Sequence, residues 1–365
     1  MQKLRNDRIT ILASTAALIA VGIIMIYSTS AVYAYEKFRD NLFFLKRHTI
    51  ALGIGVIVSL AIMSIDLQKL RQHSRKLLLV AFALLIIVLI PSASVSIGGA
   101  RRWIAVGGIR FQPVEFVKPL LLFYIADFLD RRVLKSTSLK RTFVPLLLVI
   151  CITSGLILLQ PDLGSAIELA IVGFLLLFVY GTPLKHLLYA FCLSVPILYM
   201  LILKAPYRLS RIMTFLDPWK DPRGTGFQMI QSFIALGSGG LFGVGLGNSK
   251  QKLFYLPESH TDFIFSIIGE ELGFIGTSAI VAIFAVLIWK GISIAIKKDS
   301  EFSRLLAFGI SSLIGLEVII NIGVATGLLP TKGLPLPFLG YGGSSLVAHM
   351  VLIAMLLNTG REHVR

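Results

Sequence analysis

The strongest constraint on this sequence is a series of long apolar runs separated by short polar segments. A hydrocarbon core of about 30 Å requires roughly 20 apolar residues of α-helix. Ten runs approach or exceed that length, at about residues 9–27, 48–66, 77–91, 115–129, 142–160, 165–181, 184–203, 262–289, 303–328 and 343–358. Because 56% of the residues are apolar and only 15% are charged, the sequence predicts an all-α polytopic membrane protein with about ten transmembrane helices.

The basic residues between these runs predict the orientation of the chain. A net charge of +16 would suggest nucleic acid for a soluble protein, but no basic stripe interleaved with aromatic residues is present. Positive residues favour the cytoplasmic side of a membrane, and they concentrate around residues 3–8, 69–76, 131–141 and 290–298. An even number of spans puts both termini on that side. We therefore expect cytoplasmic N and C termini, contacts with membrane lipids and no nucleic-acid partner.

The longest segment between two runs covers residues 204–261, between the seventh and eighth predicted helices. In the predicted topology this segment lies outside the cell. It contains eight aromatic residues, a short predicted helix near residues 228–236 and a glycine-rich stretch. Loops positioned by a rigid scaffold often carry function. We expect one transmembrane domain over residues 1–365, with a large extracytoplasmic loop at residues 204–261.

The polar segment before the eighth predicted helix, PESHTDFIFSIIGEELG at residues 257–273, carries several acids. Ser259 and Asp262 can cap that helix, because a carboxylate at a helix start accepts hydrogen bonds from free N–H groups. A second interpretation starts from the spacing, since Asp262, Ser266 and Glu270 are four residues apart and share one helical face. Acids inside a membrane normally face a cavity or a partner. This interpretation predicts a polar cleft with Asp262 at its mouth as a candidate catalytic carboxylate.

A second motif, GGARRWIAVGGIRFQPVEFVKP at residues 98–119, brings positive residues to the predicted outer interface. Arg101, Arg102, Arg110 and Lys118, with Glu115, can together bind a phosphate group. The alternative is structural. The arginines would extend from apolar surroundings towards water, and Glu115 and Lys118, one helical turn apart, would neutralise each other.

Two further motifs form predicted outer turns. In QPDLG at residues 160–164, Asp162 either stabilises a tight turn or supports a site on the same side as Asp262. In LLPTKGLPLPFLGYGGSSL at residues 328–346, prolines and glycines exclude a continuous helix. Non-helical chain at membrane depth is either a buried connector or the wall of a wet cavity. Tyr341 and Ser344 are the candidate binding residues of that wall.

These four motifs, in this order between the predicted spans, resemble the SEDS family, which includes FtsW, RodA and SpoVE. The resemblance covers about residues 9–358, with one departure at Val114, where many relatives have serine. It implies an inverting peptidoglycan glycosyltransferase that polymerises lipid II on the outer face of the bacterial cytoplasmic (inner) membrane. The acid of the HTDF motif, essential in the family, corresponds to Asp262. The short basic N-terminus and the GYGGSS sequence resemble the division branch.

The resemblance also implies partners, namely a class B penicillin-binding transpeptidase and other divisome or elongasome membrane proteins. Asp262 would act as a base for the acceptor hydroxyl or as the ligand of a divalent cation, Mg²⁺ or Mn²⁺, and no other cofactor is implied. The candidate substrate-binding residues are Arg101, Arg102, Glu115, Lys118, Asp162, Glu258, His260, Glu270, Tyr341 and Ser344.

Two functions of other classes stay open at the level of sequence. A lipid II flippase would use intramembrane acids such as Glu270 and Glu317 to line a translocation path. A scaffold that only recruits the transpeptidase would not need Asp262 at all. The clustering of the polar motifs on one face favours an enzyme, because alternating access needs equivalent groups on both sides or at the midplane.

Overall fold

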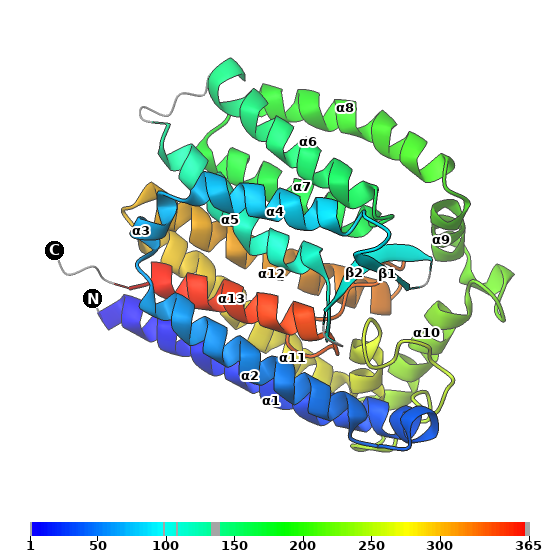
Figure 1. Cartoon of the computed structure of the whole chain (residues 1–365). Helices are drawn as coiled ribbons and strands as arrows, with labels where there is room; N and C mark the ends of the chain where they lie inside the picture. Colours follow the sequence, from blue (N-terminus) through cyan, green and yellow to red (C-terminus); the bar gives the residue numbers. More distant parts are fainter. Residues whose placement is uncertain (1, 98, 107–108, 133–138, 362–365) are drawn as a thin grey trace.

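The computed structural model describes residues 2–97, 99–106, 109–132 and 139–361 as a bundle of helices with one small sheet (Figure 1). Every predicted span contains a helix. The α-helices are α1 (Gln2–Phe38), α2 (Phe43–Ser64), α3 (Leu67–Arg71), α4 (Ser74–Ile87), α5 (Pro113–Asp130), α6 (Val144–Leu158), α7 (Leu163–Tyr180), α8 (Leu184–Leu203), α9 (Pro206–Leu216), α10 (Phe227–Gly239), α11 (Ile264–Lys297), α12 (Glu301–Ala325) and α13 (Gly343–Thr359).

The helices confirm a polytopic membrane fold. Within the described residues, 7 helices are long and apolar enough to cross a membrane, namely α1, α2, α6 together with the π-helical turn Leu139–Phe143 before it, α7, α8, α11 and α12. Helices α4 and α13 coincide with predicted spans but have only 14 and 17 residues, and α5 carries four charged residues. The total of ten spans stays a prediction. Helix α1 begins and α13 ends at the same end of the bundle, as an even number requires (Figure 1).

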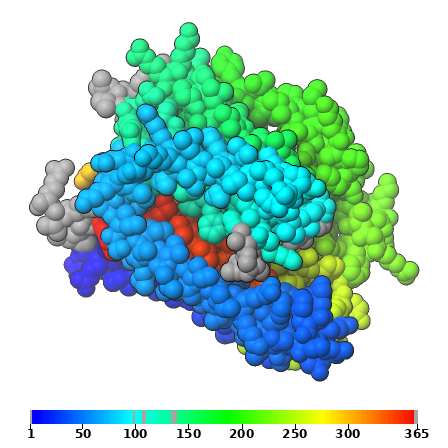
Figure 2. All heavy atoms as spheres, viewed as in Figure 1, coloured from blue at the N-terminus to red at the C-terminus, as the bar shows by residue number. Residues whose placement is uncertain are grey.

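The interior of the bundle is formed by α5, α12 and α13. Helix α12 packs against α5, α7, α11 and α13, and Phe123 of α5 meets Phe302 of α12 edge to face at 5.2 Å. Helix α8 is the opposite case, because Leu187 is its one buried residue. It lies at the margin of the bundle, so nearly its whole surface would face lipid. Figure 2 shows α13 recessed between α2 and α4, which do not cover it on this side.

A three-stranded antiparallel sheet follows α4 and was not predicted from the sequence. Its strands are β1 (Ser94–Ile97), β2 (Ala100–Val106) and β3 (Ile109–Phe111), paired in that order. Successive side chains of a strand point to opposite faces, which is why Arg101 is exposed and Arg102 is half-buried. Residues 98, 107 and 108 of the second motif lie outside the described residues.

The segment at residues 204–261 is folded rather than extended. It contains α9, the 3₁₀ turn Pro218–Lys220 and α10, followed by a series of turns that leads to α11. Helix α10 packs closely on α11 at two glycines, since a Cβ at Gly239 would lie 1.9 Å from the carbonyl oxygen of Gly269. This close contact holds α10 against the first turns of α11, the helix that follows Asp262.

Candidate active site

Asp262 lies in a turn before α11 rather than in the helix. The helix begins at Ile264, and its N-cap residue is Phe263, which makes no side-chain cap hydrogen bond. In the part of the chain that the structure describes, no N–H or O–H group donates a hydrogen bond to the Asp262 carboxylate. Capping by Asp262 is therefore wrong, and this half-buried carboxylate is available to a ligand.

The turn is fixed in place by Asn321 of α12. The Asn321 side-chain amide donates to the carbonyl oxygens of Asp262 at 2.9 Å and of Leu334 at 2.7 Å. It thereby ties the turn before α11 to the loop before α13. Asp262, Asn321 and Lys332 line a cavity of about 10 Å³, which is the volume one water molecule needs. The Oδ1 atom of Asn321 is buried and has no hydrogen-bond partner among the described residues.

Burial gives Asp262 a carboxyl group that titrates near neutrality, and neighbouring charges adjust its pKa. Burial raises the pKa of Asp262 to about 7, the negative charge of Glu258 adds to this rise, and Arg211 and Arg102 oppose it. Arg102 of β2 donates to the carbonyl of Gln160 at 3.0 Å and to that of Pro161. Arg211 of α9 donates to the carbonyl of Thr331 at 3.4 Å. Two guanidinium groups from distant segments thus act on the same carboxylate.

Glu258 and Arg102 are thus the candidate substrate-binding residues whose charges bear on Asp262. Glu258 is exposed and accepts a hydrogen bond from the Thr261 hydroxyl at 2.8 Å. Of the three arginines predicted to bind phosphate, Arg102 is the one whose charge acts on Asp262. Arg101 and Arg110 are exposed on the sheet.

Lys118 and Glu115, which the sequence predicted to bind phosphate at the outer interface, are not exposed on the surface of the bundle. Both are buried inside the bundle, and Lys118 is only 1% exposed. The Lys118 ammonium lies 3.1 Å from Glu115, 3.4 Å from Glu168 of α7 and 2.5 Å from Glu317 of α12. A buried charge is tolerated when it is paired in this way. The predicted pair of Lys118 with Glu115 is therefore one part of a larger buried cluster.

This buried charge cluster reaches the cavity beside Asp262. Glu317 also contacts His349 of α13, and Glu168 lies 3.2 Å from the ammonium of Lys332. Lys332 lines the same cavity as Asp262. The Lys332 ammonium is therefore held by an acid from the bundle interior while its side chain borders the candidate catalytic carboxylate.

Asp162 and Ser344 hold backbone segments in place. Asp162 caps α7, since its two carboxylate oxygens accept hydrogen bonds from the N–H of Ser165 at 3.1 Å and from its hydroxyl at 2.9 Å. The structural interpretation of the QPDLG turn is confirmed. The Ser344 hydroxyl accepts a hydrogen bond from the backbone N–H of Gln112 at 3.0 Å. Ser344 thus joins the last motif to the second, whereas Asp162 stabilises the start of α7.

The predicted polar face with Ser266 and Glu270 below Asp262 does not form. Asp262 is not helical, and Gly273 interrupts α11 with φ 68°. The Ser266 hydroxyl is hydrogen-bonded to Ser232 of α10 at 2.6 Å. The Glu270 carboxylate accepts hydrogen bonds from the backbone N–H groups of Lys250 at 2.9 Å and Gln251 at 3.3 Å. Glu270 therefore holds a loop against α11.

His260 and Tyr341 are in contact next to the turn that carries Asp262. The backbone N–H of Tyr341 donates to the carbonyl of His260 at 2.8 Å. The His260 ring stacks on Tyr33 of α1 at 5.7 Å, and the Tyr341 ring meets Phe44 of α2 edge to face at 4.9 Å. Burial lowers the pKa of His260, so its imidazole is neutral at pH 7. The GYGGSS loop therefore lies against the turn that carries Asp262.

Three residues of this site were missed by the analysis of the sequence. Asn321 is an amide inside an apolar run, and such a residue signals an internal partner. Lys332 lies within a quoted motif but was not singled out there as a candidate. Arg211 lies on α9, a short helix with basic residues on one side, which the sequence alone did not connect to Asp262.

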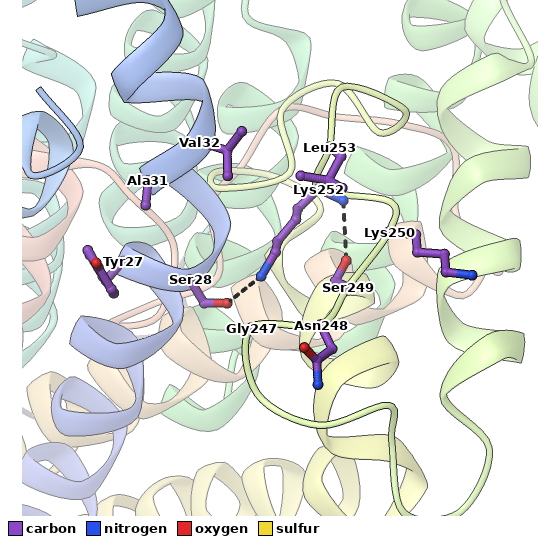
Figure 3. A pocket seen from close by; sticks show the side chains of 10 residues that line it. All are labelled: Tyr27, Ser28, Ala31, Val32, Gly247, Asn248, Ser249, Lys250, Lys252 and Leu253. Atoms are coloured by element: carbon purple, nitrogen blue, oxygen red, sulfur yellow. Dashed lines mark hydrogen bonds between the residues drawn. The ribbon is translucent and has the colours of Figure 1, made fainter. Parts of the chain in front are cut away.

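A larger cavity, of about 360 Å³, lies between α1 and the loop at residues 247–253 (Figure 3). The side chain of Lys252 crosses from this loop towards α1, where its ammonium donates to the Ser28 hydroxyl at 3.0 Å. The same ammonium pairs with Glu271 at 2.7 Å. Asp262 does not line this cavity, so this cavity and the candidate catalytic carboxylate are separate features.

Comparison with known proteins gives consistent matches over nearly the whole chain. A family model described as "Cell cycle protein" and named for FtsW, RodA and SpoVE matches residues 8–364. The chain is 45% identical over 347 residues to stage V sporulation protein E of Bacillus subtilis, covering 95% of each chain. It is 42% identical over 358 residues to a probable peptidoglycan glycosyltransferase FtsW of Geobacter metallireducens, covering 98% of this chain and 96% of the relative.

Solved structures share the fold. One, described as "Structural coordination of polymerization and crosslinking by a peptidoglycan synthase complex", matches with a TM-score of 0.80 at 31% identity and 96% coverage of both chains. The crystal structure of the rod shape determining protein RodA of Thermus thermophilus matches with a TM-score of 0.71 at 27% identity and 97% coverage of both chains. The chain thus shares its arrangement of helices with these solved structures over nearly its full length.

Proposed function

This chain belongs to the FtsW, RodA and SpoVE family, and on that premise we propose that it is a peptidoglycan glycosyltransferase. It polymerises lipid II into glycan strands on the outer face of the bacterial cytoplasmic membrane. The observation that carries the proposal is Asp262, a carboxylate with no hydrogen-bond donor among the described residues and with a pKa raised to about 7. A general base works best when its pKa is near the operating pH.

The chemistry requires a base and positive charge at one place. Asp262 accepts the proton of the acceptor sugar's 4-hydroxyl while that oxygen bonds to the anomeric carbon of the donor. The bond from that carbon to the pyrophosphate breaks, and the undecaprenyl pyrophosphate leaves with the electron pair. Attack opposite the leaving group inverts the anomeric centre. Arg102 and Arg211 stabilise the negative charge that develops on the leaving group.

A divalent cation is a second proposal for the same carboxylate. The Asp262 carboxylate and the unpaired Oδ1 of Asn321 are oxygen donors on one small cavity, and oxygen donors suit Mg²⁺ or Mn²⁺. When bound, such an ion would screen the pyrophosphate charge. No cluster of three or more His, Cys, Asp or Glu side chains is present in residues 2–97, 99–106, 109–132 and 139–361, so water and pyrophosphate would complete the coordination.

The physiological setting follows from the relatives. The FtsW and SpoVE relatives are 41–45% identical to the chain in the examples from Bacillus, Geobacter and Coxiella, whereas the RodA structure is 27% identical. This difference supports a role in division or sporulation. We propose a class B penicillin-binding transpeptidase as the main partner, together with other divisome or elongasome membrane proteins, and cytoplasmic N and C termini.

The contacts of particular residues weaken the case for the competing functions. The flippase hypothesis rested on Glu270 and Glu317. However, Glu270 is hydrogen-bonded to a loop, and Glu317 is paired with Lys118 and His349. Neither acid needs a translocation path to explain its burial. A pure scaffold leaves the position and the pKa of Asp262 unexplained.

The test is reconstitution. The purified protein, with its cognate transpeptidase, is given fluorescently labelled lipid II in detergent or proteoliposomes, and the products are separated on a gel. We expect ladders of glycan strands that disappear in Asp262→Asn protein. Transfer of lipid II across the membrane without any ladder would identify a transporter instead.

A further inference from the structure

An aromatic surface lies where α1 ends and α2 begins, beside the turn that carries Asp262. The ring of Phe44 lies 4.8 Å from His260 and 4.9 Å from Tyr341, and the ring of Tyr33 lies 5.7 Å from His260. Phe254 extends this group, at 6.1 Å from Tyr33, and is 53% exposed. His260 is two residues from Asp262. The rings therefore form a continuous path from the candidate active site to the surface.

Basic side chains accompany these rings. The Lys37 ammonium lies 5.3 Å from the centre of the Tyr33 ring and donates to the Tyr33 hydroxyl at 2.9 Å. The Arg47 guanidinium lies 4.3 Å from the centre of the Phe43 ring. Between residues 33 and 47 the chain has four basic and two acidic residues. The surface thus combines the exposed ring of Phe254 and the half-buried rings of Tyr33 and Phe43 with a positive net charge.

The surface lies beyond the lipid. A hydrocarbon core of about 30 Å takes roughly 20 helical residues at 1.5 Å each, so α1, entering at Ile9, leaves it near Ser28. Tyr33 then lies about 8 Å and Phe38 about 15 Å beyond the hydrocarbon. An aromatic belt that anchors a protein would lie at the lipid boundary itself. These rings are positioned for a water-soluble ligand, and the turns that follow α10 lie beside them (Figure 1).

The backbone around this surface is strained in a way that fits a binding site. Arg39, Phe254 and Glu258 adopt positive φ values of 57°, 68° and 54°. A side chain other than glycine costs of order 1–3 kcal/mol there and is retained where function needs it. The ring of Phe254 is largely exposed, so burial of this ring contributes little to offset the backbone strain.

We propose that this surface binds the growing glycan strand as it leaves the active site. The inference rests on the proposed function and adds the path of the product. Pyranose rings present flat C–H faces that pack on aromatic rings, and the carboxylates of peptide-bearing sugars pair with Lys37 and Arg47. A strand held here stays close to Asp262 for the next addition, so the surface determines how many sugars are added before release.

The first test measures binding without catalysis. Soluble, fluorescently labelled, peptide-bearing glycan oligomers are titrated into Asp262→Asn protein in nanodiscs. A Lys37→Ala, Phe254→Gly variant of that protein should bind them about tenfold more weakly, because one aromatic and one cationic contact are lost. Glycine is chosen at residue 254 because it accepts φ 68° without strain. The matched control is Trp219→Ala, Lys220→Ala, which removes another exposed aromatic and basic pair.

The second test measures product length in active protein. The Lys37→Ala, Phe254→Gly protein should give shorter strands per initiation than the wild type, and the control should give the same lengths as the wild type. Equal oligomer affinity or equal strand length in the patch variant and the control would overturn the proposal. Unchanged oligomer binding with loss of transpeptidase co-purification would also overturn it and assign the surface to the protein partner. The binding experiment needs no turnover, so its result is independent of whether the protein polymerises lipid II.

Discussion

The pKa of Asp262 gives a prediction that separates a general base from the alternatives. A base must be ionised to accept a proton, and burial raises the pKa of Asp262 to about 7. About half of the carboxyl groups are then ionised at pH 7, about 9% at pH 6 and about 91% at pH 8. The turnover rate should therefore fall about fivefold from pH 7 to pH 6 and rise less than about twofold from pH 7 to pH 8.

The neighbouring charges allow the midpoint of this profile to be moved in both directions. The negative charge of Glu258 raises the pKa of Asp262, so Glu258→Gln should lower the midpoint and preserve more activity at pH 6. Arg211 lowers that pKa, so Arg211→Ala should move the midpoint to higher pH. Asp299→Asn, which neutralises an exposed acid beyond the far end of α11, is the matched control and should leave the midpoint unchanged.

The assay is the initial rate of strand formation at saturating lipid II between pH 5.5 and 8.5. A profile that is flat between pH 6 and pH 8 in the wild type would refute the raised pKa on which the base assignment rests, because an aspartate with an ordinary pKa is fully ionised there. So would identical midpoints in Glu258→Gln, Arg211→Ala and wild-type protein. A flat profile combined with loss of activity on adding a chelator, restored by Mg²⁺, would instead assign Asp262 to a divalent cation.

Three other predictions follow from the contacts. Asp262→Asn should insert normally and retain its transpeptidase but lose at least about 100-fold in polymerisation rate, since the charge is lost at nearly constant size; near-normal ladders would exclude Asp262 as the base. Arg102→Ala should lower the rate in folded protein. Lys118→Ala should instead lower stability by about 3–5 kcal/mol, because it leaves buried acids unpaired. Thermal unfolding of the two variants can distinguish a loss of rate from a loss of stability. Lys250→Cys in a protein without Cys151 and Cys192 should react with an impermeant maleimide from outside intact cells, and labelling only after lysis would contradict the topology.

The sequence predicts the spans and the identity of Asp262 because both depend on local patterns. Apolar runs of sufficient length report helices directly, and a polar motif before a helix locates the acid. The sequence does not predict the interruption of α11 at Gly273, because GEELGF has ordinary helical composition. The reason for the break is tertiary. A Cβ at Gly273 would lie 2.3 Å from the backbone nitrogen of Gly243, so these two backbone segments can approach each other only if both positions are glycine.

The position of Lys118 was missed for a related reason. Its partner Glu115 is visible in the sequence, but Glu168 and Glu317 lie on other helices, and the sequence gives no indication that they converge. A lysine with one visible acid reads as an interfacial pair. With three acids around it, the same lysine is a buried structural cation. The sheet at residues 94–111 was missed because its strands of four, seven and three residues are too short for a clear alternating pattern.

The four motifs that identify the family meet around Asp262 through hydrogen bonds to one another. Arg102 of the second motif donates to carbonyls of the QPDLG turn, and Gln112 donates to Ser344 of the last motif. Asn321 joins the turn of Asp262 to the loop that contains Lys332. Most motif residues therefore position backbone, and their substitution should lower the folded fraction. Arg102 does this too, but its charge also acts on Asp262, so its substitution should lower the rate even of the protein that folds. Asp262 differs because its carboxylate holds nothing in place, so a loss of rate without any loss of stability is expected there.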